Sequence, residues 1–140
     1  GQMTGPTPGA IALGPVHAGD PVAQVLNARA SGDPLVLEDG REAMVLASYA
    51  LPDGRFCREL EVIDRAASRL DYAVGCLRVD GWSIESAVAE VIASDTGTGF
   101  VAAEGATGDP MARFLARAGA SLPLDPEAEA QVIARGWTAR

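Results

Sequence analysis

Two cysteines and a single histidine are the first residues of this sequence to consider for chemistry. A thiolate paired with an imidazole is a nucleophile, so His17 beside Cys57 or Cys76 would suit covalent catalysis. That interpretation needs a third group to orient the histidine, and the sequence does not indicate one. One histidine and two distant cysteines also lack the spacing of metal ligands, so we expect neither a metal site nor a bound cofactor.

Two acidic residues and one glycine-rich stretch are the remaining candidates for chemistry. Glu59 and Glu61 alternate in an extended segment, which places both carboxylates on one face about 7 Å apart. Paired carboxylates can act as general acid and base, yet charged side chains on a solvated sheet face are the simpler interpretation. The stretch Thr96–Gly99 has the sequence Thr-Gly-Thr-Gly without a lysine or a strand-then-helix frame, which favours a turn over a phosphate site. We therefore expect no enzymatic activity.

The two cysteines belong to a predicted β-hairpin. Two extended segments flank the polar break Arg65–Ser68, which is the pattern of a hairpin turn. If the turn consists of these four residues, Asp64 faces Arg69, and counting outward along both strands places Cys57 opposite Cys76. Directly opposed Cβ atoms lie about 4.5–5.5 Å apart in a non-hydrogen-bonded pair, close enough for a disulfide. In an oxidising compartment we expect a bridge that closes a loop of roughly 20 residues and contributes about 3 kcal/mol; the alternative is two buried free thiols in a cytosolic protein.

Three short helices are predicted from a shared opening. Each begins with Asp-Pro, where the aspartate accepts an unpaired backbone amide and the proline loses no hydrogen bond. Apolar residues follow at helical spacing, and a glycine lies beyond the end of each segment. These features predict helices over about 21–30, from Asp109 to near Gly119, and from Asp125 to Gly136. In the last helix, Glu127 and Glu129 lie in the first turn, where they suit the helix dipole.

An antiparallel sheet is predicted between the first helix and the other two. Asp-Gly steps favour tight turns, because glycine tolerates the positive φ that such turns require, and they occur at 39–40, 53–54 and 80–81. Extended segments adjoin these turns at 35–37, 41–51, 56–63 and in the stretch that contains Cys76. Residues 82–92 suit a strand or a helix, and we favour a strand for the first half because a turn leads into it. A short edge strand is expected within 11–16, where Pro15 allows only an edge, and a loop over 93–108.

Length and charge narrow the class of protein further. A chain of 140 residues suggests one domain, which we place at 11–137, with a flexible linker over 1–10 and a tail over 138–140. The net charge of −8 repels nucleic-acid phosphates and anionic lipids, so we expect neither as a direct partner. The sequence contains no apolar run long enough to span a membrane, and its start does not resemble a signal peptide. A targeting segment for export would therefore have to precede this sequence.

Two blocks of the sequence resemble a known family. Residues 53–59 have the pattern Asp-Gly-Arg-x-Cys-Arg-Glu, and residues 75–82 have the pattern Gly-Cys-x-Arg-x-Asp-Gly-Trp. Both resemble the periplasmic part of transmembrane anti-sigma factors of proteobacteria, as do residues 99–105, the helix after Asp109 and residues 124–137. Besides the two cysteines, the motif residues are Asp53, Gly54, Arg55, Arg58, Glu59, Gly81 and Trp82. A Cys-Arg-Glu hairpin with a second cysteine before Asp-Gly-Trp is also similar to the C-terminal domain of small outer-membrane surface-antigen lipoproteins.

The resemblance implies a non-enzymatic sensor domain in the periplasm. Anti-sigma factors of this kind have a cytoplasmic segment that sequesters an extracytoplasmic-function sigma factor, one membrane helix and an envelope domain. This sequence corresponds to the envelope domain, so it would reach the sigma factor and the membrane only through segments outside it. Its direct partner would be an envelope protein or ligand. The second resemblance implies a surface-antigen-like module that binds protein or cell-wall partners, and in either case we favour a structural disulfide over a redox sensor.

The predicted fold is therefore an α+β domain. Its centre is an antiparallel β-meander of about four or five strands, with one helix before it and two short helices after it. The hairpin is stapled by a disulfide between Cys57 and Cys76.

Overall fold

The computed structural model describes residues 11–92 and 110–138. Three predicted features lie outside these ranges: the linker over 1–10, the whole loop over 93–108 together with its Thr96–Gly99 stretch, and the helix cap at Asp109. The elements of the described residues are β1 (Gly14–Pro15), α1 (Pro21–Ala28), β2 (Leu35–Val36), β3 (Glu42–Ala50), β4 (Phe56–Asp64), β5 (Arg69–Arg78), β6 (Gly81–Val91), α3 (Pro110–Arg117) and α4 (Pro126–Ala134).

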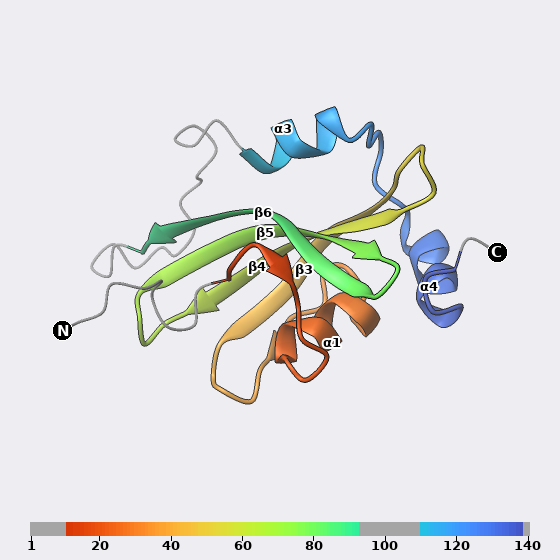
Figure 1. Ribbon diagram of the computed structural model, residues 1–140. Coiled ribbons are helices and arrows are strands. Elements are labelled where there is room, and N and C mark those ends of the chain that lie inside the picture. The colour runs from red at the N-terminus through yellow and green to blue at the C-terminus, as the bar shows by residue number, and fades with distance from the viewer. Residues whose placement is uncertain (1–10, 93–109, 139–140) are drawn as a thin grey trace.

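The six strands form one antiparallel sheet with the order β1-β6-β5-β4-β3-β2 (Figure 1). Strands β3 to β6 are neighbours both in the chain and in the sheet, as a meander requires. The predicted α+β class is confirmed, with one helix before the meander and two after it. Strand β2 pairs with β3 and brings the meander to five strands, within the predicted number, and the two-residue strand β1 adds a sixth strand at the edge beside β6.

The ambiguous segment after the Asp80–Gly81 turn is a strand over nearly its whole length. Strand β6 pairs with β5 from Arg78 opposite Gly81 to Arg69 opposite Val91, with one irregularity between Val74 and Gly75. The strand therefore runs well past the first half, to which the prediction had assigned it. A continuous partner strand decides the outcome, because a helix would leave the backbone groups of β5 on this side without a ladder.

Two of the three predicted helix caps fall on described residues, and both are confirmed. The Asp20 carboxylate accepts a hydrogen bond from the Val22 amide at 2.9 Å, and that of Asp125 accepts one from the Ala128 amide at 2.8 Å. The first helix ends at Ala28, earlier than predicted, because Arg29 is already extended.

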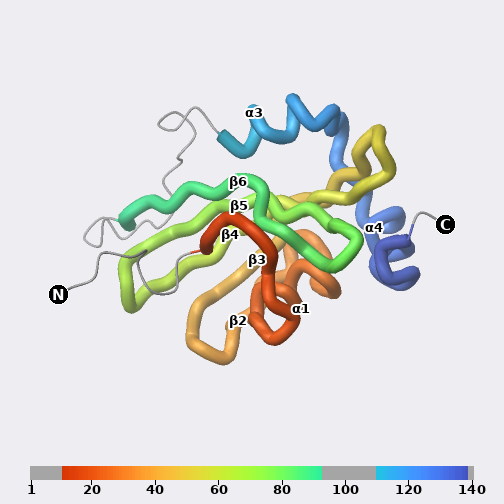
Figure 2. The backbone as a smooth tube through the Cα atoms, in the orientation of Figure 1, coloured from red at the N-terminus to blue at the C-terminus, as the bar shows by residue number. Residues whose placement is uncertain are grey.

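The helices cover both faces of the sheet (Figure 2). Helices α1 and α4 contribute to a large core cluster on one face, which contains Leu60 and Trp82. Helix α3 contributes Met111 and Leu115 to a smaller cluster on the other face, which contains both cysteines. We refer to these as the α1 face and the α3 face. None of the helices among the described residues is long and apolar enough to cross a bilayer.

Candidate functional site

The motif around residue 55 begins with a tight turn. The Asp53 carboxylate accepts hydrogen bonds from the backbone amide and the guanidinium of Arg55, both at 3.0 Å. Gly54 has φ of +91° and Gly81, in the second block, has φ of +133°, values that side chains with a Cβ rarely adopt. Gly54, Gly81 and Asp53 therefore stabilise the turns that precede β4 and begin β6.

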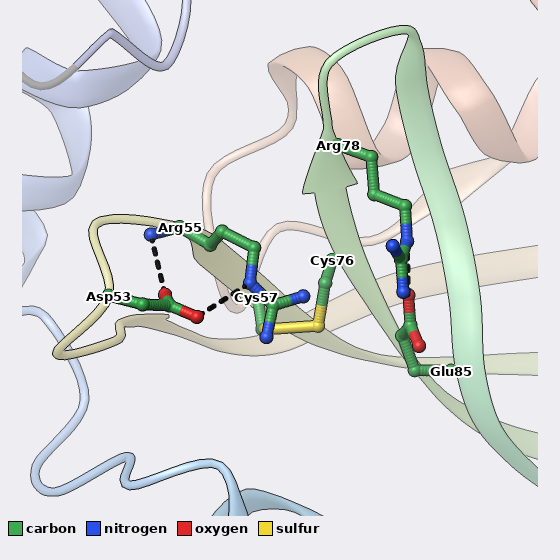
Figure 3. The surroundings of a disulfide bond; sticks show 6 residues. All are labelled: Asp53, Arg55, Cys57, Cys76, Arg78 and Glu85. Carbon is green, nitrogen blue, oxygen red and sulfur yellow. Dashed lines mark hydrogen bonds and ion pairs between the residues drawn. A yellow bond between two sulfur atoms is a disulfide. The ribbon is translucent and has the colours of Figure 1, made fainter.

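The two cysteines form the predicted disulfide. Cys57 lies opposite Cys76 in the β4–β5 ladder, Asp64 lies opposite Arg69, and a bond joins the two sulfur atoms (Figure 3). The Cα atoms of the cysteines are 3.9 Å apart, which is shorter than the roughly 4.5 Å of the closer type of antiparallel pair. Both cysteines are fully buried. A buried disulfide under α3 is sheltered from thiol exchange, which favours the structural role over a redox sensor.

Ion pairs flank the disulfide along the strands. Figure 3 shows Arg55 bound to Asp53 on one side and Arg78 bound to Glu85 on the other, where the Arg78 Nη2 to Glu85 Oε2 distance is 2.7 Å. The Arg78–Glu85 pair links β5 to β6. Because three of the four side chains are substantially exposed, each pair contributes little to stability.

Arg58, the neighbour of Cys57, points to the opposite face and is completely buried. Its Nε donates to the Ser48 hydroxyl at 2.8 Å, its Nη1 donates to the Leu26 carbonyl at 2.8 Å, and its Nη2 donates to the Arg29 carbonyl at 2.5 Å. The carbonyls at the C-terminus of a helix lack partners within the helix. Arg58 therefore caps α1 from strand β4, and its positive charge suits the negative end of the helix dipole.

Glu129 of α4 balances the buried charge. Its carboxylate accepts from Arg58 Nη2 at 3.0 Å, from the Ser48 hydroxyl at 2.5 Å, and from both the amide and the hydroxyl of Ser31. Burial by itself would raise the pKa of this carboxyl group, but the hydrogen bonds from Ser31, Ser48 and Arg58 outweigh burial and lower it. Glu129 is therefore ionised in the folded protein at neutral pH. Burial lowers the pKa of Arg58, and Glu129 opposes that shift.

Aromatic residues complete this buried cluster. Trp137 packs edge-to-face against Phe56 and Trp82, at centroid distances of 5.5 Å and 5.2 Å. The Arg58 guanidinium carbon lies 4.8 Å from the Trp137 ring centroid, and the Trp137 indole donates to the Asn27 carbonyl at 2.9 Å. The motif residue Trp82 is thus a core residue, and Trp137 is a second tertiary cap of α1. We call the set of Ser31, Ser48, Arg58, Glu129 and Trp137 the Arg58 cluster.

Backbone contacts bring the distant members of the Arg58 cluster to β3. The Gly32 amide donates to the Val45 carbonyl at 2.8 Å, next to Ser31, and the Leu124 amide donates to the Ser48 carbonyl at 2.8 Å, just before α4. Ser31 and the start of α4 are therefore held close to β3. Gly75 supports the same packing, because a Cβ there would lie 3.1 Å from a methyl of Leu26 on α1.

The glutamates of β4 lie on the α3 face, which is only partly solvated at their positions. Both Glu59 and Glu61 are half-buried. Burial raises the pKa of the Glu61 carboxyl group. The sheet carries apolar residues on this side, including Val74 and Tyr72 opposite these glutamates, so the carboxylates lose part of their hydration.

His17 does not form a nucleophilic pair with either cysteine. It lines a hollow near the start of α1, whereas both cysteines lie in the core cluster of the α3 face and are oxidised. Within residues 11–92 and 110–138, no cluster of three or more His, Cys, Asp or Glu side chains could hold a metal ion.

Sequence reasoning identified Arg58 but missed its partners. Arg58 shares its side of β4 with Phe56, Leu60 and Val62, so simple alternation already places a charge among core residues. A buried arginine requires an acidic partner, but nothing in the sequence singles out Glu129 from the exposed Glu127 beside it. Both glutamates lie in the first turn of a helix, and a favourable interaction with the helix dipole is an equally good explanation for each.

Comparisons with protein-family models, with curated proteins and with solved structures find no match to this chain.

Proposed function

We propose that this chain is the non-enzymatic periplasmic domain of a membrane-anchored anti-sigma factor that controls an extracytoplasmic-function sigma factor. The observation that supports this most directly is the disulfide between Cys57 and Cys76. It fits an oxidising compartment such as the bacterial periplasm, because reducing systems keep cytosolic thiols free.

The motif residues support the same proposal through their structural roles. In the block 53–59, Asp53 and Gly54 form a turn, and Cys57 is bonded to Cys76 of β5. Arg58 forms a hydrogen bond with α1 and an ion pair with Glu129 of α4. In the block 75–82, Gly75 leaves room for the Leu26 side chain of α1, and Trp82 lies in the core. The resemblance therefore rests on residues that specify one fold, and a shared domain is the simplest reason for it.

In this proposal the domain acts by changing state. A signal or an envelope partner must bind one state of the domain better than another, because equal affinity for both states shifts nothing. In this proposal, the cytoplasmic segment that holds the sigma factor and the membrane helix would be other parts of the same protein. The domain would pass its change to them through the membrane.

The full-length gene in its own bacterium provides the test. We would delete the codons for residues 11–137 and measure a reporter that depends on the sigma factor. The deletion is expected to change basal or stress-induced reporter activity at least severalfold. The full-length protein should fractionate with the inner membrane and carry the oxidised cysteine pair. An unchanged reporter together with two alkylatable thiols in the native protein would contradict the proposal.

The alternative function is a surface-antigen-like envelope lipoprotein domain that binds protein or cell-wall partners. It shares the Cys-Arg-Glu hairpin and the disulfide, so the fold supports both proposals equally. The upstream part of the gene separates them. A lipoprotein signal would favour the surface-antigen module, whereas a cytoplasmic segment followed by a membrane helix would favour the regulator.

A further inference from the structure

The two long strands next to the edges of the sheet, β3 and β6, are covered to different extents. Strand β3 pairs with β2, and two of its carbonyl groups accept amides from the segments before β2 and before α4. Strand β1 pairs with β6 only at Ser83 and Ile84, and β6 extends well beyond it (Figure 1). Among the described residues, no segment pairs with the outer side of β6 after Ile84. The edge from Glu85 to Val91 is therefore open on this part of the chain.

The register of the sheet shows which residues of β6 turn their backbone groups outward. Residues of an antiparallel ladder alternate between pairs that exchange hydrogen bonds and closer pairs that do not. The short Cα distance between Cys57 and Cys76 marks a pair without hydrogen bonds, so Cys76 turns its N–H and C=O groups toward β6. By the same alternation, Val74 exchanges hydrogen bonds with its partner Ser86 on β6. The residues of β6 that turn away from β5 are then Ala87, Ala89 and Val91.

These three outward residues leave the edge accessible to another strand. The alternation agrees with the Ile92 amide, which points inward and donates to the Ser68 carbonyl at 2.8 Å. Ala89 is exposed, Val91 is 85% exposed, and Ala87 is half-buried against the core. None of the three is charged or a proline, the residue types that proteins commonly place on an edge to prevent further pairing.

A second copy of β6 fits this edge in one register. Antiparallel pairing about a twofold axis at Ala89 places Ala87 opposite Val91 of the second copy, and the two Ala89 residues face each other. All three outward residues are then paired, whereas an axis one residue away in either direction pairs only two. The large Val91 meets the small Ala87 on one face, and Glu90 meets Val88 on the other. Because no like charges lie opposite each other, the strand is complementary to itself.

We propose that two copies of this chain associate through the outer edges of β6, so that one sheet continues across both copies. The net charge of −8 on each copy opposes the association. Salt screens this repulsion, because the screening length is only about 8 Å at physiological ionic strength. The dimer goes beyond the proposed regulatory function, and its test does not depend on any sigma factor.

Sedimentation equilibrium of the oxidised protein is the first experiment. We expect a reversible monomer–dimer equilibrium that tightens as the NaCl concentration rises. A monomer at every concentration up to about 1 mM would overturn the proposal. Growth into larger species would also overturn it, because the twofold pairing uses the edge of each copy completely.

A matched pair of lysine variants tests the position of the interface. Ala89→Lys places two ammonium groups opposite each other at the axis and should weaken the dimer about fivefold. Ala130→Lys is the control, because Ala130 is exposed on α4, which lies beside β3 at the other side of the sheet, and the change in charge is the same. Both variants should unfold at the same urea concentration as the wild type. Equal dimer affinities of the two variants would contradict the interface.

Hydrogen exchange distinguishes this interface from any other. The amides of Ala87, Ala89 and Val91 point outward, so their exchange should slow when the protein concentration rises and the dimer forms. The amides of Ser86 and Val88 already bind β5 and should keep the same exchange rates. A dimer in which the three outward amides exchange as fast as in the monomer would show that the copies meet elsewhere, and it would overturn the proposal.

Discussion

Cys57 and Arg58 are neighbours in β4 that stabilise opposite faces of the sheet in different ways. Cys57 joins β4 to β5 by a covalent bond beneath α3. Arg58 joins β4 to α1 and α4 by hydrogen bonds and a buried ion pair with Glu129. The disulfide joins two strands of one hairpin, whereas Arg58 contacts two helices that are distant from β4 in the sequence. The α1 face should therefore be the more sensitive of the two to single substitutions.

The largest effect is expected from Glu129→Gln on the α1 face. The variant keeps the size of the side chain but leaves the fully buried Arg58 charge without a counter-ion. Loss of one partner of a buried ion pair costs about 3–5 kcal/mol. Urea unfolding of the oxidised protein measures the change in free energy.

The exposed Glu127 supplies the control for this prediction, because it lies in the same helical turn. Glu127→Gln should change the free energy of unfolding by less than about 1 kcal/mol. The double variant Arg58→Met with Glu129→Leu removes both charges and should recover part of the loss. Similar losses for Glu127 and Glu129 would show that the ion pair does not hold α4.

The second effect concerns the α3 face. Replacement of both cysteines by alanine should lower the free energy of unfolding by about 3 kcal/mol, because the unfolded hairpin regains the entropy of an open loop. Dithiothreitol treatment of the wild-type protein should give a similar loss and have no effect on the variant. If the variant matched the oxidised wild type in urea, the disulfide would not stabilise this face.

The pH dependence of stability should have opposite signs on the two faces. Glu129 has a pKa below its ordinary value of 4.5, so it stabilises the fold above that value and loses this effect as the pH falls through the folded-state pKa. The deficit of Glu129→Gln should therefore shrink in acid. Free energies of unfolding measured between neutral pH and pH 3 would reveal this convergence, and a deficit that stayed constant would contradict it.

Substitution of Glu61 on the α3 face should have the smallest effect on stability, and its pH dependence should have the opposite sign to that of Glu129. Burial raises the pKa of Glu61 above 4.5, so the ionised form disfavours folding at neutral pH, and this penalty disappears as the pH falls through the folded-state pKa. Glu61→Gln should be slightly more stable than the wild type at pH 7 and equal to it in acid. A variant less stable than the wild type at pH 7 would show that Glu61 has a stabilising partner.

Much of the fold was predictable where the signals are local. The turn at Arg65–Ser68 sets the pairing of β4 with β5, so a count of residues was enough to pair Cys57 with Cys76. The helix caps at Asp20 and Asp125 could also be predicted, because each aspartate binds an amide within three residues along the chain. The end of α1 was misplaced because its carbonyls bind Arg58 and Trp137, which are distant in the chain.

The candidate sites show the same limit. Arg58 stands out in the sequence as a charge within an apolar alternation, but Glu129 lies 71 residues away and resembles any glutamate at a helix start. Glu61 was expected on a solvated face, and its burial depends on packing that no local pattern reports. His17 and Asp20 lie in one turn before α1, and only the folded chain brings Arg41 to the same hollow.

The sequence by itself determined the class of fold, the turns, two helix caps and the disulfide register, because each depends on backbone geometry over a few residues or one hairpin. The tertiary structure alone decided which carboxylate neutralises Arg58 and where α1 ends. Those choices depend on long-range packing, in which burial removes water and makes a specific partner necessary.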